Sequence, residues 1–384
     1  MFRLPIVKFF NRIFNRVTIT VVLVALQVLW LLWAFWSFTA GRVWLNGALK
    51  ALSILIVLYL VRKDENSAYK IGWIVLIGLL PLLGGALYLA FGNKAPAKYL
   101  RERMQKVEQA HQTELAQPEG QTDALDISSR NLSRYVAKFG PYPAWRDTAA
   151  HYFSCGEEMY PQLLADLEKA EKFIFLEFFI LRSGKMWDGV EQILRRKAAQ
   201  GVDVRLIYDD FGSLLDEEPL AETVYLDILS QAQRYVYIYT PYLAVGEEML
   251  DALKSAAKRG VDVRLILPGI PDKKLVFRLS RSYYLPLLRA GVRIYEFTPG
   301  FLHAKCYVSD DRVAVVGSIN MDYRSLFLHF ECGTLLFHNS QIAALRKDVE
   351  RTLPQCREIM RSDCRTNLPG TALDSVLRLL SPLM

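Results

Sequence analysis

The sequence predicts N-terminal transmembrane helices followed by an α/β domain built from two related halves, of which the first is truncated. Three observations predict this architecture: two long uncharged apolar runs, a duplicated strand segment, and a polar motif that follows only the second copy. The chain of 384 residues has room for two or three units, because a domain usually takes roughly 100 to 200 residues.

Two apolar runs near the N-terminus predict membrane spans. Val17–Phe38 and Ile71–Gly92 each contain 22 residues and no charged side chain. Each run exceeds the roughly 18 to 20 apolar residues that cross a hydrocarbon core. Between them, Val43–Val61 contains Asn46 and Lys50, so this segment predicts either a third span or no span.

The distribution of Lys and Arg around these segments bears on their orientation, because short cytoplasmic loops retain basic residues. Three full spans would place seven basic residues on each side, which predicts no orientation. If Ile71–Gly92 instead turns back at Pro81, Gly84 and Gly85, twelve basic residues lie on one side of the membrane and two on the other. This second arrangement predicts a cytoplasmic C-terminal domain.

Charge and cysteine content narrow the classes of partner and cofactor. The net charge of +7 fits anionic lipid head groups and nucleic acid equally well. The membrane segments argue against nucleic acid. The cysteines are odd in number and lack the spacing of a metal site, so we expect free thiols, no metal and no cofactor. They are Cys155, Cys306, Cys332, Cys356 and Cys364.

Composition divides the chain into four predicted regions. They are a membrane-spanning segment (1–95), a polar linker (96–131), a truncated first half (132–215) and a second half that carries the polar motif (216–384).

A repeat relates the two halves. Gly-Val-Asp-Val-Arg-Leu-Ile occurs at Gly201–Ile207 and again at Gly260–Ile266. An apolar run typical of a buried strand precedes each copy, at Lys172–Leu181 and Arg234–Leu243, and a helical segment lies between run and copy. Strand, helix and strand, written twice, predict a parallel-type α/β sheet built from two related units.

The two copies continue differently. A basic helix at Asp272–Gly291, a strand and a polar motif follow the second copy. Only "YDDFGSLL" separates the first copy from the acidic segment that begins at Asp216. By the spacing of the repeat, a counterpart of His303 would fall near residue 244, where the second half is already under way.

The polar motif is H-x-K-x-x-x-x-D followed by G-S-x-N. Its members are His303, Lys305, Asp310, Ser318 and Asn320. Residues two apart in a strand share a face, so we expect the imidazole and the ammonium to lie together. The imidazole can attack phosphorus or protonate a leaving oxygen, and the ammonium can neutralise phosphoryl oxygens. Ser318 and Asn320 can donate hydrogen bonds to those oxygens.

Other residues are candidates for supporting roles. We expect the Glu331 carboxylate to hold the second ring nitrogen of His303. Asp310 fits a structural turn better than chemistry. The predicted basic helix either binds lipid phosphates or forms a solvated face. Its cations are Lys273, Lys274, Arg278 and Arg281.

These residues carry a resemblance to a known family. "HAKCYVSD" with "GSIN" resembles the signature of the phospholipase D superfamily. "NSAYKIGWIVLIGLLPLLGGALYLAFGN", "FIFLEFFIL" and "LVFRLSRSYYLPLLRAGVRIYEFTPGFLHAK" resemble the membrane segment and catalytic domain of bacterial cardiolipin synthases. The resemblance implies a multi-pass protein of the bacterial cell membrane. It also implies condensation of two phosphatidylglycerol molecules into cardiolipin and glycerol through a phosphohistidine intermediate.

The resemblance adds one candidate and one departure. Glu177 matches an acidic position of the family, although a solvated or paired carboxylate is an equal alternative. Family members carry two motifs whose histidines meet at a pseudo-twofold axis as nucleophile and general acid. This chain lacks the first motif, which usually supplies the nucleophile, between Leu214 and Asp216.

Three functions stay open from the sequence. The first is a phosphatidyltransferase of the cardiolipin synthase type, with or without impaired activity. The second is a catalytically silent lipid-binding relative. The third is a phosphodiesterase, nuclease or lipase that works as a homodimer with one motif per chain. The expected partners are the membrane and phosphatidylglycerol, with a second copy of the chain as an alternative and no nucleic acid.

Overall fold

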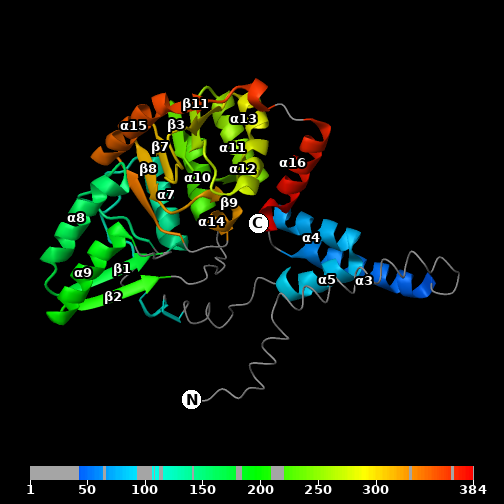
Figure 1. Cartoon of the computed structure of the whole chain (residues 1–384), viewed down its shortest axis with the longest axis horizontal. Helices are drawn as coiled ribbons and strands as arrows, with labels where there is room; N and C mark the ends of the chain where they lie inside the picture. The colour runs from blue at the N-terminus through cyan, green and yellow to red at the C-terminus, as the bar shows by residue number, and fades with distance from the viewer. Residues whose placement is uncertain are drawn as a thin grey trace, which may run out of the picture. The chain divides into compact units, whose positions relative to one another are not determined.

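The structure is a computed structural model (Figure 1). It describes residues 43–63, 66–92, 106–107, 109–111, 116–140, 142–178, 184–208, 220–327, 331–364 and 367–383. The chain divides into two compact units, Met1–Lys106 with Ser375–Met384, and Val107–Asp374. Each unit is described by itself.

In the N-terminal unit, the apolar run Ile71–Gly92 is divided among several short helical segments. The unit contains α3 (Val43–Arg62), α4 (Ser67–Leu79), α5 (Pro81–Leu87) and a π-helical turn (Tyr88–Gly92). Between α4 and α5, Leu80 leaves the helical region with φ −131° and ψ 75°. Pro81 then begins α5, because proline cannot continue the hydrogen-bond ladder of α4.

A glycine permits the close packing of α5 on α4. A Cβ atom at Gly84 would lie 2.6 Å from the carbonyl oxygen of Leu76, a distance that real Cβ atoms do not reach. The run Ile71–Gly92 is therefore divided at Pro81, one of the residues at which the sequence predicts that it could turn back.

The membrane spans predicted from the sequence are not confirmed. Within the described part of the chain, none of the helices combines the length and the apolar character that a membrane crossing requires. The run Val17–Phe38 lies outside the described residues.

The first half of the α/β domain is a small two-stranded unit. It contains α8 (Gly156–Lys169), β1 (Phe173–Phe178), α9 (Lys185–Ala199) and β2 (Asp203–Tyr208), and the two strands pair in parallel. The helices cover one face of the strands, where Ile174 packs with Leu167 and Ile193. Phe173 and Phe175 alternate with Ile174 and are 59% and 54% exposed, and the Arg205 guanidinium stands 5.0 Å from the centroid of the Phe175 ring, so no described helix covers the second face.

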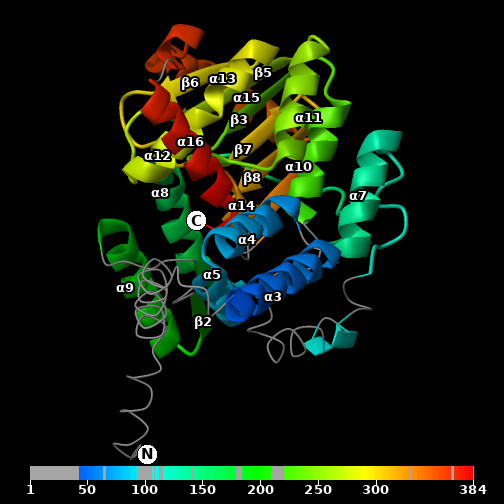
Figure 2. The same cartoon turned by 90° about the vertical axis from the view of Figure 1, so that its right-hand side faces the viewer.

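The second half contains a seven-stranded sheet with the order β10-β8-β7-β3-β5-β6-β11 (Figure 2). Its strands are β3 (Tyr235–Tyr239), β5 (Asp262–Pro268), β6 (Arg293–Phe297), β7 (Cys306–Ser309), β8 (Val313–Gly317), β10 (Gly333–Phe337) and β11 (Cys356–Glu358). A short parallel pair joins β4 (Leu243–Ala244) and β9 (Met321–Asp322).

Helices precede, connect and follow these strands. They are α7 (Ile127–Phe139), α10 (Leu220–Gln231), α11 (Glu247–Lys258), α12 (Lys274–Ser282), α13 (Tyr284–Ala290), α14 (Tyr323–Phe327), α15 (Ser340–Thr352) and α16 (Leu368–Leu380). Short 3₁₀ turns cover Leu353–Gln355, Arg361–Cys364 and Ser381–Leu383.

The α/β class is confirmed, but the large sheet is mixed rather than parallel. β3, β5 and β6 run in parallel, as the strand-helix-strand repeat predicts. β7 pairs antiparallel with β3, and β8 pairs antiparallel with β7. The turn between β7 and β8 is too short for a parallel crossover, and it places Asp310 and Asp311 at φ 55° and 59°.

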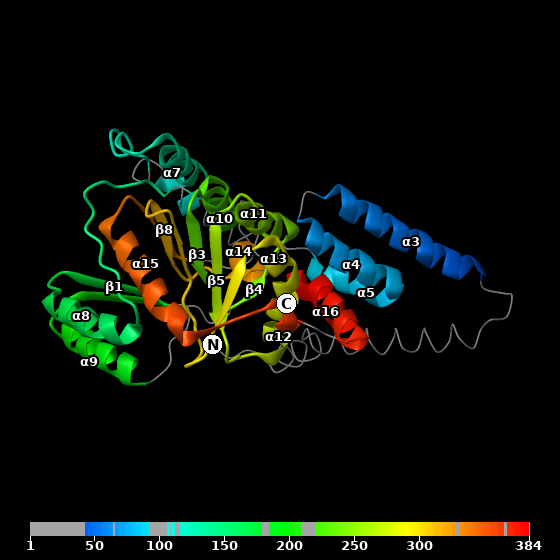
Figure 3. The same ribbon diagram turned by 90° about the horizontal axis from the view of Figure 1, so that it is seen from above.

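Helices cover both faces of this sheet. Seen from above in Figure 3, α15 lies on one face while α10 and α11 lie on the other. Alternate residues of β3 face the two layers: Tyr235 and Tyr239 join the core with Ile342 and Leu345 of α15. The sheet is thereby buried on both sides, as its long apolar strands require.

The repeat predicted from the sequence is present as β1-α9-β2 and β3-α11-β5. In the second half, β7 pairs with one edge of β3, and α15 covers the tyrosine face. In the first half, β1 pairs only with β2 among the described strands, and its phenylalanine face is exposed. The first half therefore lacks, within the described residues, the partners that β7 and α15 supply to the second.

Two predicted boundaries differ from the structure. The helix expected over Asp272–Gly291 is divided into α12 and α13 at Tyr283, because Pro286 fits only the first turn of a helix. The segment expected as a linker (96–131) contains the start of α7 and a loop bound to the domain. Its Gln117 side chain accepts from the Ala144 backbone N–H at 2.8 Å and donates to its carbonyl oxygen.

Candidate functional site

The structure brings His303 and Lys305 together directly before β7. The Lys305 Nζ atom lies 2.9 Å from His303 Nδ1 and donates to the His303 carbonyl oxygen at 2.6 Å. Leu302 and Cys306, which alternate with them, are buried in the core beneath α15. Burial of these apolar neighbours fixes the side of the chain on which the histidine and the lysine lie.

The contact between the two side chains selects a tautomer of the histidine. An ammonium group has three donors and no acceptor, so His303 Nδ1 must accept from Lys305. The neutral ring then carries its proton on Nε2. In this arrangement Nε2 can donate a hydrogen bond, but it has no lone pair with which to attack phosphorus.

Burial and neighbouring charges shift both pKa values downward. Desolvation lowers the pKa of Lys305 to about 8, although the carboxylates of Glu331 and Asp322 oppose that shift. Desolvation also lowers the pKa of His303, the Lys305 ammonium lowers it further, and Asp272 opposes both effects. Near neutral pH the pair is therefore a neutral imidazole beside a cationic lysine.

Two residues at this site were not identified from the sequence. The Tyr242 hydroxyl donates to Asp272 Oδ2 at 2.5 Å, and the Tyr242 ring stands edge-on to the His303 ring at 6.5 Å. Tyr242 follows β3 and Asp272 follows β5. Because the carboxyl ends of parallel strands meet at one edge of a sheet, the positions directly after β3 and β5 could have indicated both residues.

A hydrogen-bonded network centred on Glu331 holds the G-S-x-N segment. Ser318 Oγ donates to Glu331 Oε2, and Ser325 Oγ donates to Oε1 at 2.7 Å. Asn320 Nδ2 in turn donates to Ser325 Oγ at 3.0 Å. The network fixes Ser318 and Asn320, the two side chains that the sequence assigns to phosphoryl oxygens.

The predicted hydrogen bond between Glu331 and His303 is not formed among the described residues. The reason lies in the register of β10 against β8, which pairs Gly333 with Gly317. This register places the residues just before β10 beside Ser318, and the Cys332 N–H donates to Ser318 Oγ at 2.9 Å. Of the two carboxylates, Asp272 rather than Glu331 acts on the charge of His303.

Asp310 lies at the opposite end of β7 from Lys305 and is buried. Its carboxylate accepts from the backbone N–H groups of Gln233, Arg234 and Tyr235 at 2.7, 2.8 and 2.9 Å. These donors lead into β3. Asp310 therefore joins the β7–β8 turn to the start of β3, and a direct catalytic role does not fit its position.

The four cations of the predicted basic helix differ in their environments. Lys273 stands over the Tyr242 ring, 5.9 Å from its centroid, and so lies near the histidine. Lys274 is exposed. Arg278 pairs with Asp374 at 2.7 Å, and Arg281 pairs with Glu296 at 3.5 Å. Only the two lysines are without a carboxylate partner in the described structure.

Glu177 is exposed on β1 and makes no contact with the motif residues in the part of the chain that the structure describes. No group of three or more His, Cys, Asp or Glu side chains among the described residues is arranged to hold a metal ion. The positive charge at the site comes from lysine side chains.

Comparisons with known proteins agree with the motif. A family model described as "Cardiolipin synthase, PLD-like domain" matches residues 225–353, which run from α10 through α15. A second, described as "Phospholipase_D-nuclease N-terminal", matches residues 51–93. The first match contains every residue of the His303 and Glu331 clusters and excludes β1 and β2.

Individual relatives extend the similarity along the chain. An uncharacterised protein of Streptococcus mutans is 31% identical over 457 positions, covering 85% of this chain and 99% of that protein. A cardiolipin synthase of a Geobacillus species is 27% identical over 478 positions, covering 89% and 95%. Both alignments are longer than the chain itself, so these relatives contain residues without a counterpart here.

Among solved structures, a phospholipase D family member, Nuc, from Salmonella typhimurium matches with a TM-score of 0.33 and 16% identity. The match covers 38% of this chain and 94% of that one.

Replacement of Asp310 should lower the stability of the folded protein and should not act directly on catalysis. Asp310→Ala removes the acceptor of three backbone N–H groups, of which that of Tyr235 is buried, at a cost of about 1–3 kcal/mol. Denaturant unfolding of the purified chain should show this loss. The control Asp251→Ala, on the exposed side of α11, should leave the unfolding midpoint nearly unchanged. An Asp310→Ala protein of unchanged stability would contradict the structural role.

Proposed function

The chain belongs to the cardiolipin synthase family of the phospholipase D superfamily, and from this membership we propose that it condenses two phosphatidylglycerol molecules into cardiolipin and glycerol. The observation that carries the proposal is the His303–Lys305 pair beside the network that holds Ser318 and Asn320. These four side chains supply one potential nucleophile or acid and three donors for phosphoryl oxygens.

The first step is binding of a lipid phosphate. A phosphodiester anion attracts the Lys305 ammonium more strongly than a neutral imidazole does, so substrate draws Lys305 away from His303 Nδ1. The Ser318 hydroxyl turns from Glu331 to the same phosphate, and Asn320 donates to it through its second amide proton. Once Nδ1 is released, the ring proton can move there and leave a lone pair on Nε2. Asp272, held by Tyr242, is the carboxylate whose charge raises the pKa of His303 and so stabilises the ring when it becomes positively charged.

The covalent chemistry then proceeds in two displacements. Nε2 attacks phosphorus, the bond from phosphorus to the glycerol oxygen breaks, and the glycerol oxygen takes a proton. A hydroxyl of the second phosphatidylglycerol then attacks phosphorus and gives up its proton. The bond to Nε2 breaks, and cardiolipin forms. Positive charge from Lys305 and the fixed donors stabilises the phosphoryl oxygens in both steps.

A single chain with one motif lacks the second histidine that would protonate the departing glycerol oxygen. In the family, a histidine of the other motif supplies it, and such acid assistance contributes about 10²–10⁴-fold. This chain has one motif, so we infer that a monomer turns over slowly. A homodimer would supply a second His303, and the uncovered face formed by Phe173 and Phe175 is an available contact surface.

We also propose that the protein resides in a bacterial cell membrane with a cytoplasmic α/β domain. The uncharged run Val17–Phe38 supports this, since it is long enough for a hydrocarbon core. Leu55, Leu58 and Tyr59 of α3 are exposed in the structure, and such a surface fits lipid better than water. The net charge of +7 suits anionic head groups.

One observation favours a second candidate, a catalytically silent lipid-binding relative. The acceptor role of His303 Nδ1 leaves the ring in the tautomer that cannot attack, and the first motif is absent. A chain that bound phosphatidylglycerol but never released Lys305 from His303 would have this site and no turnover.

Product analysis with phosphatidylglycerol vesicles distinguishes the candidates. We expect the reconstituted protein to form cardiolipin, to keep its activity in excess chelator, and to lose it in His303→Ala. Phosphatidic acid as the product would assign a hydrolase, and no product would assign a silent relative. Equal turnover by His303→Ala would contradict the mechanism.

The pH dependence of cardiolipin formation should separate the two basic groups. Activity should rise as His303 loses its proton and fall as pH passes about 8, the pKa of Lys305. Asp272→Asn removes a charge that raises the pKa of His303, so only the acidic limb should move to lower pH. Glu331→Gln should lower the pKa of Lys305 and move only the alkaline limb. Both limbs moving together in either variant would contradict these assignments.

A further inference from the structure

A basic hollow lies along α7, apart from the residues of the candidate catalytic site. Its volume is about 230 Å³. One wall is a single face of α7, and the other is the loop that precedes the helix. Its lining includes Arg130, Ser133, Arg134 and Lys138 from the helix and Gln117 and Thr122 from the loop.

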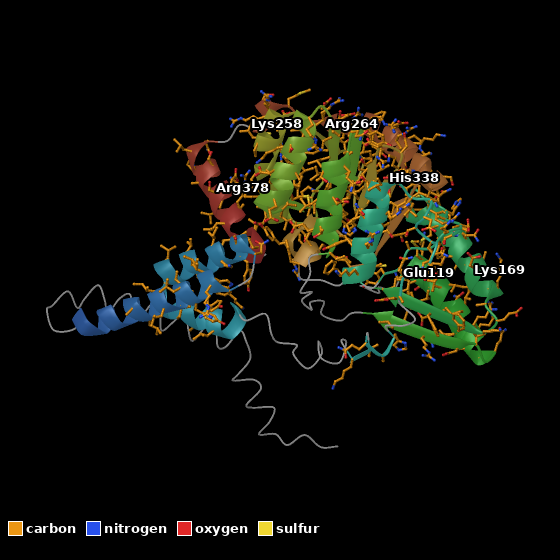
Figure 4. All side chains as sticks on the ribbon, turned by 180° about the vertical axis from the view of Figure 1, so that it is seen from behind. Glu119, Lys169, Lys258, Arg264, His338 and Arg378 are labelled. Carbon is orange, nitrogen blue, oxygen red and sulfur yellow. The ribbon has the colours of Figure 1, made fainter. Side chains whose placement is uncertain are left out.

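The helix that forms this hollow is attached firmly to the large sheet. Asp126 caps its N-terminus and accepts from the backbone N–H groups of Ser128 and Ser129. The same carboxylate pairs with Arg312 at 2.6 Å and lies 2.8 Å from Nε2 of His338, which Figure 4 labels. Burial opposes ionisation of Asp126, but the hydrogen bonds from His338, Ser129 and Arg312 outweigh it and hold the pKa of Asp126 well below its usual range. The hollow therefore has one rigid wall.

The loop wall is held as well. Arg130 donates to the backbone carbonyl oxygens of Thr122, Asp123 and Leu125, at 3.3, 2.8 and 3.1 Å. The Gln117 side-chain amide accepts from the backbone N–H of Ala144 and donates to the backbone carbonyl oxygen of the same residue. The loop is thus tied to the helix at one end and to the following segment at the other.

The hollow carries positive charge that no carboxylate neutralises. Among the residues that the structure describes, the Arg130 guanidinium bonds only to carbonyl oxygens. Arg134 and Lys138 have no carboxylate partner in the described part of the chain, and Lys138 stands beside the Phe139 ring. Three cations on one side of a helix repel one another unless an anion lies between them.

A buried hydroxyl lines the same hollow without a hydrogen-bond partner. Ser133 is 3% exposed, and its Oγ atom has no partner in the described structure. A buried hydroxyl normally has a partner, because leaving it unpaired costs about 1–3 kcal/mol. A ligand oxygen at this position would accept from Ser133 and complete the site.

We propose that the hollow binds the phosphodiester head group of an anionic phospholipid, outside the catalytic site. Arg134 offers a planar pair of donors that matches two phosphate oxygens, and Lys138 adds a point charge. Ser133 supplies the buried donor. Neutral or cationic ligands would leave the three charges uncompensated.

Exposed aromatic side chains near residues that line the hollow favour a lipid over a soluble phosphate. Phe139, whose ring contacts the ammonium group of Lys138, is 50% exposed, and Trp145, next in the chain to the Ala144 that Gln117 bonds, is 62% exposed. Exposed aromatic rings next to uncompensated cations are typical of protein surfaces that meet the head-group region of a membrane. The site extends the proposed function, since the lipids are of the same class as its substrate, but it does not use His303.

The test follows the thermal unfolding midpoint of the full-length protein in phosphatidylcholine micelles as phosphatidylglycerol is added. A ligand that binds only the folded state raises this midpoint. Arg134→Gln with Lys138→Gln should require at least about tenfold more phosphatidylglycerol for the same rise, because two charge-assisted contacts are lost. The matched control is Lys258→Gln with Arg289→Gln, which removes two exposed, unpaired cations from α11 and α13.

Ser133→Ala gives a second signature that a merely structural role would not produce. Without lipid its midpoint should equal or exceed that of the wild type, because no hydrogen bond is lost. Its response to phosphatidylglycerol should weaken several-fold. The control Ser128→Ala, on the same helix but outside the hollow, should respond like the wild type.

Two outcomes would overturn the proposal. The first is an undiminished lipid response in the Arg134 and Lys138 variant, or an equal loss in its control. The second is saturation of the response by inorganic phosphate, with no further rise on adding phosphatidylglycerol, which would assign the hollow to a soluble anion. His303→Ala should keep the lipid response while losing turnover, so failure here is distinguishable from failure of the proposed function.

Discussion

The pairing of β7 with β3 is the constraint on which the catalytic half depends. Its register joins Tyr239 to Cys306 at one end and Val236 to Ser309 at the other. At the first end the strand delivers Lys305 and His303 to the carboxyl edge of β3 and β5. At the second end Asp310 accepts three backbone donors that lead into β3. A slip by one residue would turn the histidine and lysine towards α15.

The same pairing explains what the first half lacks. β1 repeats β3, and β2 repeats β5, but the described structure places no strand on the remaining edge of β1. Phe173 and Phe175 stand where Tyr235 and Tyr237 stand in the second half, and they are exposed because no described helix covers them. The absence of the first motif is thus accompanied by an absence of the sheet neighbour and the covering helix that would support it.

Much of this arrangement was predictable from the sequence, since it depends on local patterns. The duplicated Gly-Val-Asp-Val-Arg-Leu-Ile segment predicts both strand-helix-strand units, and Pro81 predicts the break between α4 and α5. The two-residue spacing of His303 and Lys305 predicts their contact. Each of these features depends on residues close together in the chain, where period and turn chemistry decide the outcome.

The rest depends on contacts between distant segments. Asp272 and Tyr242 meet beside His303 because β3 and β5 end at one edge of the sheet, and no spacing in the sequence announces that pairing. The partner of Glu331 is set by the register of β10 on β8, which the sequence does not display. The bound loop before α7 depends on Gln117, which lies in the segment that composition predicts to be a polar linker.

One motif supplies either the nucleophile or the general acid but not both, so a single chain should turn over slowly. Specific activity of cardiolipin formation, measured against protein concentration in detergent together with the mass of the particle, tests it most directly. The account predicts little activity from a particle of one 44.0 kDa chain and a rise only as dimers form. Full activity from the single chain, independent of concentration, would contradict it and require another residue to replace the missing histidine.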